Sequence, residues 1–244
     1  MVDILNPDES FSVNDFAIKA VETIEDILSR GKMPVLCGGT GQYISALYYG
    51  IKYVDEPIDQ KIIDDLYIEF ENQGIDRIYD ELVRVDPVAS EKIHKNNTRR
   101  VIRAYAVYLS TGKNFTWWNE NSKTEGPAYP YKLFAIDHDR SILYDRINKR
   151  VDIMINDGLI EEVKSLYEAH LLDNSTAKQA IGYKELFDYI DGNSSLDDAI
   201  YQIKLRSRHY AKKQLTWFRY MEGLELLNPS NLDLEIENII EKIK

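Results

Sequence analysis

Residues 33–41 read MPVLCGGTG, a short apolar run that leads directly into a glycine-rich turn. The run at 33–37 is bounded by glycines and predicts a buried strand of a parallel sheet. The segment YISALYY at 43–49 predicts a helix directly after the turn. A strand, a glycine-rich turn and a helix in this order are typical of an α/β fold with crossover connections.

The flanking segments extend this α/β pattern. Residues 12–30 predict a helix, since Ser12 and Asp15 form a capping-box pattern ahead of apolar residues at helical spacing. Later helical patterns lie at 59–72, 75–84, 98–111, 139–156, 159–169 and 195–220, and strand patterns lie at 132–137 and 224–228. We therefore expect an α/β core formed by residues 1–54 and 131–244, interrupted by an all-helical insertion at 55–130.

The charges of the chain are unevenly distributed. Its 244 residues carry 30 Lys and Arg against 41 Asp and Glu, a net charge of −11, which by itself disfavours phosphate binding. Residues 92–103 and 204–213 nevertheless hold ten Lys or Arg and no acid, leaving −21 for the other 222 residues. These two runs could be solvated helix faces or docking sites for a polyanion, and the sequence leaves both interpretations open.

The GGTG turn at 38–41 also has two interpretations. Glycines at the start of a helix let backbone N–H groups approach an anion closely, and the Thr40 hydroxyl could donate to an oxygen. The glycines could equally be present because a tight turn needs them. The 244 residues contain no GxxxxGK[ST] match and therefore no complete phosphate cradle.

Two arginines one helical turn apart, Arg146 and Arg150, could grip a diphosphate through paired N–H donors. They could instead be exposed partners of Asp145 and Asp152. On the late helix, a stripe of positive charge suits a phosphate backbone, and it consists of Lys204, Arg208 and Lys212.

Other functions have less support in the sequence. The single cysteine, Cys37, is expected to pack in the strand at 33–37, and none of the four histidines has the spacing of metal ligands, so no metal-binding residue is predicted. No stretch approaches ~20 consecutive apolar residues, so no membrane span is expected.

Six segments of the chain resemble, in order and with similar spacing, those of the tRNA dimethylallyltransferases, also called tRNA isopentenyltransferases. They are DILNPDESFSVNDF, RGKMPVLCGGTGQY, VDPVASEKIHKNNTRRVIRA, LYDRINKRVDIMINDGLIEEV, QAIGYKEL and RHYAKKQLTWFR. The resemblance covers essentially the whole chain. It implies a parallel-sheet core similar to P-loop NTPases and nucleotide kinases, with an all-helical insertion that grips the anticodon stem-loop of tRNA.

The resemblance also implies a reaction. A dimethylallyl group would move from dimethylallyl diphosphate to N6 of the adenosine immediately 3′ of the anticodon, in the cytoplasm, with Mg²⁺ assisting the departure of diphosphate. The target base would leave its stack to reach the donor, as enzymes that modify a base generally require.

Family roles transfer to matching positions of this sequence. Thr40 would lie at the reacting centre, with Gly38, Gly39 and Gly41 beside it as diphosphate-binding residues, and a diphosphate role for Arg146 and Arg150 is our hypothesis. The positions that would contact tRNA are Arg99, Arg100, Val101, Ile102, Arg103, Gln179, Ala180, Ile181, Gly182, Tyr183, Lys184, Arg208, Lys212, Lys213, Gln214 and Arg219.

One departure from the family pattern limits these expectations. Family members open with a strand, a P-loop and a DSxQVY segment whose Asp acts as general base, and neither motif occurs in these 244 residues. We therefore expect an N-terminally truncated chain with little or no transferase activity of its own. Two alternatives stay open: a non-catalytic remnant that binds tRNA without turnover, and a small-molecule kinase-like enzyme that transfers phosphate from ATP.

Overall fold

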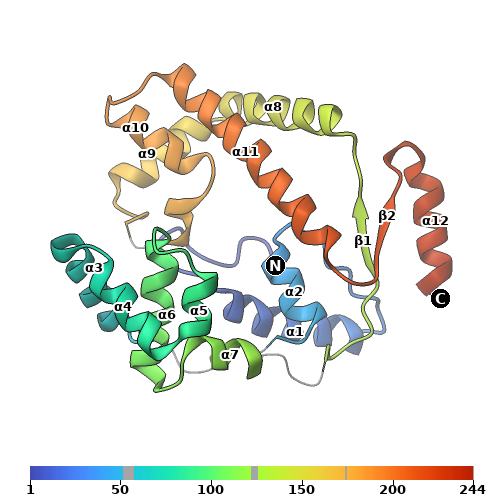
Figure 1. Cartoon of the computed structure of the whole chain (residues 1–244). Coiled ribbons are helices and arrows are strands. Elements are labelled where there is room, and N and C mark those ends of the chain that lie inside the picture. Colours follow the sequence, from blue (N-terminus) through green and yellow to red (C-terminus); the bar gives the residue numbers. More distant parts are fainter. Residues whose placement is uncertain (52–57, 122–125, 174, 244) are drawn as a thin grey trace. The chain divides into compact units, whose positions relative to one another are not determined.

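The computed structural model describes residues 1–51, 58–121, 126–173 and 175–243. Two compact units make up the chain (Figure 1): Met1–Ile44 with Pro130–Lys244, and Ser45–Tyr129. We call them the α/β unit and the helical unit. The expected boundary between residues 54 and 55 lies outside the described residues.

The α/β unit is mostly helical and contains a small parallel sheet. Its elements are α1 (Val13–Ser29), β1 (Leu133–Ile136), α8 (Arg140–Asn156), α9 (Leu159–Glu168), the 3₁₀ turn η1 (Thr176–Gln179), α10 (Tyr183–Ile190), α11 (Leu196–Arg219), β2 (Leu224–Leu227), η2 (Pro229–Asn231) and α12 (Leu232–Ile243). Helix α2 (Gly41–Tyr48) begins in this unit and continues into the helical unit.

The two predicted strands form the sheet. β1 and β2 pair in parallel, with Leu133 opposite Leu224 and Ile136 opposite Leu227. Parallel strands need a long crossover connection, and here the crossover contains all the helices from α8 to α11. The α/β class is therefore confirmed in its coarse form.

The strand predicted at 33–37 is wrong. Residues 32–40 are neither helix nor strand, and Val35 is 83 % exposed. A strand exists only where a neighbour completes its backbone hydrogen bonds. In the described part of the chain, β1 and β2 bond only to each other, so the apolar run has no ladder to join. Cys37, expected to pack in that strand, is exposed.

The predicted helices follow from local contacts. At α1, Ser12 Oγ accepts a hydrogen bond from the Asp15 amide at 3.2 Å, while the Asp15 carboxylate accepts from the Ser12 amide at 2.8 Å. This reciprocal pair is the predicted capping box, and the same hydrogen bonds lower the pKa of Asp15. Gly31, with φ +65°, follows the C-terminal end of α1 as expected.

Helices α8 to α11 share one apolar core. Val151 of α8, Val163 of α9, Leu186 of α10 and Ile203 of α11 are each 3 % exposed or less. This core holds together the segments that carry most of the predicted ligand-binding residues of the unit.

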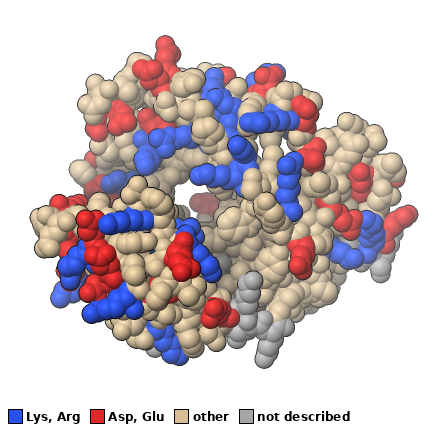
Figure 2. Space-filling model, viewed as in Figure 1, with Lys and Arg blue, Asp and Glu red and all other residues tan. Residues whose placement is uncertain are grey.

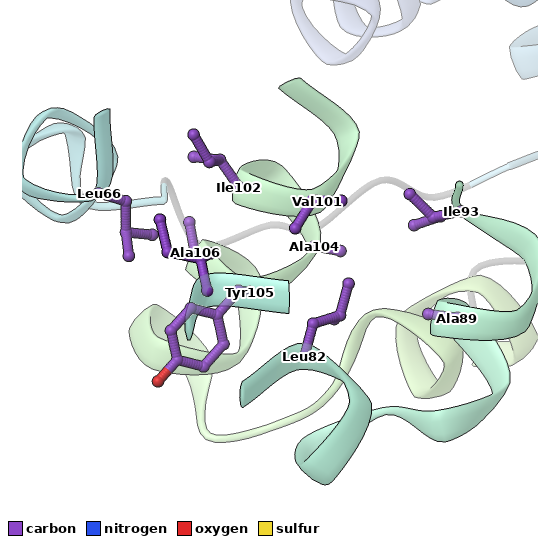
Figure 3. Close-up of a cluster of buried hydrophobic side chains, with 10 residues drawn as sticks. Leu66, Leu82, Ala89, Ile93, Val101, Ile102, Ala104, Tyr105 and Ala106 are labelled. Carbon is purple, nitrogen blue, oxygen red and sulfur yellow. The ribbon is translucent and has the colours of Figure 1, made fainter. Parts of the chain in front are cut away.

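The helical unit contains α3 (Gln60–Gln73), α4 (Asp76–Val85), α5 (Pro87–Lys92), α6 (Thr98–Thr111) and α7 (Phe115–Asn121). Its core is built around α6, whose Val101, Ile102 and Tyr105 belong to one buried cluster with Leu66 of α3 and Leu82 of α4 (Figure 3). The sequence patterns predicted α3, α4 and α6 but not the short helices α5 and α7. No helix among the described residues is both long enough and apolar enough to cross a membrane.

Candidate functional site

The GGTG turn leads into α2 as predicted. The Thr40 carbonyl accepts hydrogen bonds from the amides of Tyr43 at 3.0 Å and Ile44 at 3.1 Å, so the helix starts directly after the turn. Thr40 itself is exposed. The first N–H groups of a helix have no partner within the helix and favour negative charge. The turn therefore presents an exposed hydroxyl beside groups that can bind an anion.

Two of its glycines lie close to side chains of α11. Gln214 donates a hydrogen bond to the Gly39 carbonyl at 2.8 Å, across 175 residues of sequence. A Cβ at Gly39 would lie 2.3 Å from Nε2 of Gln214, and one at Gly41 would lie 2.4 Å from Cδ1 of Trp217. None of the glycines at 38, 39 and 41 has a positive φ, so space and not backbone conformation explains them.

We expect Gly41→Ala to destabilise the α/β unit by about 1–3 kcal/mol, the usual cost of overpacking. The atoms that a Cβ would meet are the inner ring atoms of Trp217, and they cannot move aside as the end of a flexible chain could. Urea unfolding followed by circular dichroism measures the change. Gly38→Ala is the control, because no heavy atom lies within 4 Å of its Cβ position. Equal stability of the two variants would contradict this explanation.

Arg146 and Arg150 lie on α8, and both are exposed. Nη1 of Arg146 lies 2.9 Å from Nε2 of His138. Arginine carries only donors, so in this contact Nη1 of Arg146 donates and Nε2 of His138 accepts. No sequence pattern had pointed to His138. The position of His138 just beyond β1 could have identified it as a candidate ligand-binding residue, because ligands of open α/β sheets bind at the carboxyl ends of strands.

The acids considered as partners of these arginines have other partners. Asp145 forms an ion pair with Lys149 at 3.5 Å, and Asp152 forms one with Lys204 at 2.5 Å. The described ion pairs include neither Arg146 nor Arg150. This leaves their guanidinium groups available for a diphosphate.

Helix α11 presents only part of its predicted basic stripe. Lys204 is paired with Asp152, and Nη1 of Arg208 donates to Oδ1 of Asn148 at 2.6 Å. Lys212 and Lys213 are exposed beside Gln214, which holds the GGTG turn. Figure 2 shows Lys and Arg side chains gathered along α11 on the drawn face. The exposed charge therefore lies toward the C-terminal half of the helix, next to the glycine turn.

The segment QAIGYKE runs from Gln179, the last residue of η1, into the start of α10, a helix that the sequence patterns did not predict. Gln179, Ala180, Ile181 and Lys184 are exposed, whereas Gly182 is buried with φ +105°. The Tyr183 hydroxyl donates to the Glu162 carboxylate. Burial, aided by this hydrogen bond, raises the pKa of Tyr183 to about 12, so the phenol is protonated at neutral pH.

In the helical unit, α6 presents three exposed arginines, Arg99, Arg100 and Arg103. Partial desolvation lowers the pKa of Arg103, and the charge of Arg99 one turn away adds to the effect. Among the described residues, the ion pairs include none of the three. Val101 and Ile102 are 0 % and 1 % exposed, so their side chains belong to the core and are not available to RNA.

Three of the ten cations in the two basic runs are neutralised by acids from outside the runs. Lys95 pairs with Asp76 at 2.7 Å, Lys204 pairs with Asp152, and Arg206 pairs with Glu185 at 3.0 Å. The runs therefore carry less free charge than their sequence indicates.

The described residues contain no group of three or more His, Cys, Asp or Glu side chains that could hold a metal ion. Magnesium in proteins is usually bound by one or two carboxylates together with substrate phosphates. A site of that kind needs fewer than three protein ligands, so the Mg²⁺ implied by the resemblance stays a prediction.

Comparison with known proteins matches the chain to one family. A family model described as IPP transferase matches residues 1–221. The chain is 44 % identical to the tRNA dimethylallyltransferase of Oceanobacillus iheyensis over 245 residues, and 45 % identical to that of Geobacillus thermodenitrificans over 246. Each match covers 100 % of this chain and 78 % of the relative.

Solved structures agree with the sequence matches. A tRNA isopentenylpyrophosphate transferase from Staphylococcus epidermidis is 39 % identical, with a TM-score of 0.66, and the match covers 99 % of this chain and 78 % of that chain. A eukaryotic dimethylallyltransferase acting on tRNA is 30 % identical, with a TM-score of 0.74, and the match covers 94 % of this chain and 59 % of that chain.

Proposed function

The chain belongs to the IPP transferase family and matches relatives named tRNA dimethylallyltransferase, and we propose that its exposed basic residues and its GGTG turn serve dimethylallyl transfer to tRNA. The acceptor is N6 of the adenosine immediately 3′ of the anticodon, and the donor is dimethylallyl diphosphate. The reaction takes place in the cytoplasm, where tRNA is available.

The observation that supports this proposal best is the hydrogen bond from Gln214 to the Gly39 carbonyl. It holds the GGTG turn, which can bind an anion, against the helix that carries Lys212 and Lys213. A diphosphate at the turn would then lie beside positive charge suited to a tRNA backbone. A parallel sheet and a glycine turn leading into a helix also suit a P-loop-like core, which we propose for this unit.

The proposed chemistry is a substitution at the allylic carbon. The adenosine N6 attacks this carbon, and a C–N bond forms while the C–O bond to diphosphate breaks. The electron pair leaves with the diphosphate, and N6 loses a proton to solvent water. N–H groups of the turn, the Thr40 hydroxyl and the Arg146 and Arg150 guanidinium groups would stabilise the charge that develops on the diphosphate.

In the helical unit we propose that Arg99, Arg100 and Arg103 dock the anticodon stem-loop. Each is exposed, and Arg99 and Arg103 repel each other in the free protein. A phosphate between them would relieve this repulsion. Phosphate contacts of this kind position a nucleic acid without reading its sequence.

Fluorescence anisotropy with a labelled anticodon stem-loop tests the proposal, because binding does not depend on turnover. We expect the 244-residue chain to prefer the unmodified anticodon stem-loop by at least tenfold over the same stem closed by an unrelated tetraloop. Equal affinity for both RNAs would contradict the proposal. Phosphate transfer from ATP to a small molecule would favour the kinase-like alternative.

A transfer assay on unmodified tRNA, read by mass spectrometry of the nucleosides, separates the enzyme from a binding remnant. Because the P-loop and DSxQVY motifs do not occur in these 244 residues, we expect them alone to form little or no isopentenyl-adenosine. Selective RNA binding without product would agree with that expectation. Substantial product would show that the expected inactivity is wrong, while supporting the proposed reaction.

A further inference from the structure

The carboxylate of Glu185 joins two segments, the loop before α10 and helix α11, for which the family resemblance implies contact with tRNA. Its side chain is 4 % exposed, and each of its oxygens is engaged by another part of the protein. Oε2 accepts a hydrogen bond from the Gly182 amide at 2.8 Å, and Oε1 forms an ion pair with Nε of Arg206 on α11 at 3.0 Å. A buried charge is retained only where it is paired and hydrogen-bonded, and both conditions are met here.

The Gly182 contact determines the path of the loop before α10. Gly182 has φ +105°, a backbone conformation that L side chains rarely adopt. The chain turns at this residue, between the exposed Ala180 and Ile181 on one side and Lys184 on the other. Fixing the amide of Gly182 therefore fixes where these exposed residues are presented.

The Arg206 contact connects this loop to α11. Arg206 is 51 % exposed, and it lies half a turn before Arg208 on the same helix. Tyr183 provides a second attachment, through its hydroxyl, to Glu162 on α9. The start of α10 is thus held by α9 and α11, in addition to the apolar contacts of Leu186.

We propose that Glu185 is a positioning residue for RNA binding. It holds the Gln179–Lys184 loop at a fixed position relative to the basic residues of α11. This inference rests on the proposed function. Glu185 does not itself contact RNA, because its carboxylate is buried and both of its oxygens are engaged by protein donors.

Glu185→Gln tests the proposal with little change in volume. A glutamine has one carbonyl oxygen and an NH₂ group, so it can accept from Gly182 or from Arg206 but not from both in the observed arrangement. We expect hydrogen exchange of the Gly182 amide to accelerate at least tenfold. We also expect the affinity for the labelled anticodon stem-loop to fall at least fivefold, with the helical circular dichroism signal unchanged.

A double-mutant cycle with Lys184→Ala distinguishes positioning from a general loss of structure. If Glu185 acts through the loop, its substitution should cost less affinity when Lys184 is already absent, because coupled residues are not additive. Arg206→Gln is the second variant should Glu185→Gln fail to fold. It removes the more exposed partner, and we expect a smaller loss of affinity in the same direction.

The outcomes separate the two proposals. If the unaltered chain shows no preference for the anticodon stem-loop, both are overturned. If that preference holds but Glu185→Gln changes neither Gly182 exchange nor affinity, only the positioning role is overturned. Faster exchange with unchanged affinity, or additive effects of the two substitutions, would also overturn the positioning role and leave the proposed function standing.

Discussion

Replacing Asp86 with alanine should destabilise the helical unit by about 3–5 kcal/mol. Asp86 is 1 % exposed, and it joins two helices. Oδ1 caps α5 by accepting from the Ala89 amide at 3.0 Å, and it also accepts from the Thr116 hydroxyl at 2.6 Å. Oδ2 accepts from the Thr116 amide of α7 at 2.7 Å.

The size of this effect follows from the number of donors that would be left without a partner. Each hydrogen bond to a charged group contributes about 1.5–3 kcal/mol, and a buried donor that loses its partner is costly in itself. Total stabilities of domains are about 5–15 kcal/mol, so the loss would be a large share. Thr116→Val, which removes only the hydroxyl and its one hydrogen bond to Asp86, should cost about 1.5–3 kcal/mol by the same reasoning.

Urea unfolding monitored by circular dichroism, together with limited proteolysis, provides the measurement. Asp80→Ala is the matched control, since Asp80 lies on α4 at the surface and such substitutions usually stay within about 0.5 kcal/mol. If Asp86→Ala and Asp80→Ala lower the free energy of unfolding by similar amounts, the buried hydrogen bonds of Asp86 contribute little to stability.

The second large effect concerns RNA affinity. Changing Arg99, Arg100 and Arg103 together to glutamine should lower the affinity for the anticodon stem-loop about 100-fold near 0.15 M salt. Each phosphate contact adds about 0.7–0.9 to the slope of log affinity against log salt, which corresponds to a factor of about 4–5 at that salt concentration. The slope itself should therefore fall by about 2–3.

The chain offers a control with the same change in net charge. Three other cations of the helical unit already form ion pairs: Arg77 with Glu69, Arg84 with Glu81, and Lys95 with Asp76. Changing these three to glutamine should alter the affinity less than threefold, because their charges are neutralised in the free protein. If both triple variants weaken binding equally, general charge and not the exposed face of α6 governs the affinity.

The helices show how far local patterns could predict this fold. The pattern at 98–111 matches α6, Thr98–Thr111, because both ends carry their own signals. Asn97 caps the first turn, and Gly112 ends the helix in the left-handed conformation. Helix α10 was missed because it is short and begins at Gly182, whose backbone conformation no neighbouring residue in the sequence reveals.

The run MPVLC shows where local patterns fail. Its composition is that of a buried strand, yet these residues form no strand and Val35 is exposed. A strand depends on hydrogen bonds to a segment far away in sequence, whereas a helix completes its bonds within a few residues. The apolar composition of this run therefore predicted a strand, but no segment among the described residues pairs with it.

Some features of the candidate site could be predicted from local sequence, and others could not. The family, the exposed arginines of α6 and the glycine turn were all evident from the sequence, because motif order and helical spacing are local properties. Which charges are free of acidic partners, and why position 41 needs a glycine, depended on the tertiary structure. Acids and side chains distant in sequence decide both, as Asp76 does for Lys95 and Trp217 does for Gly41. Coulombic and steric contacts act over a few ångströms of space, and separation along the chain does not determine which groups come that close.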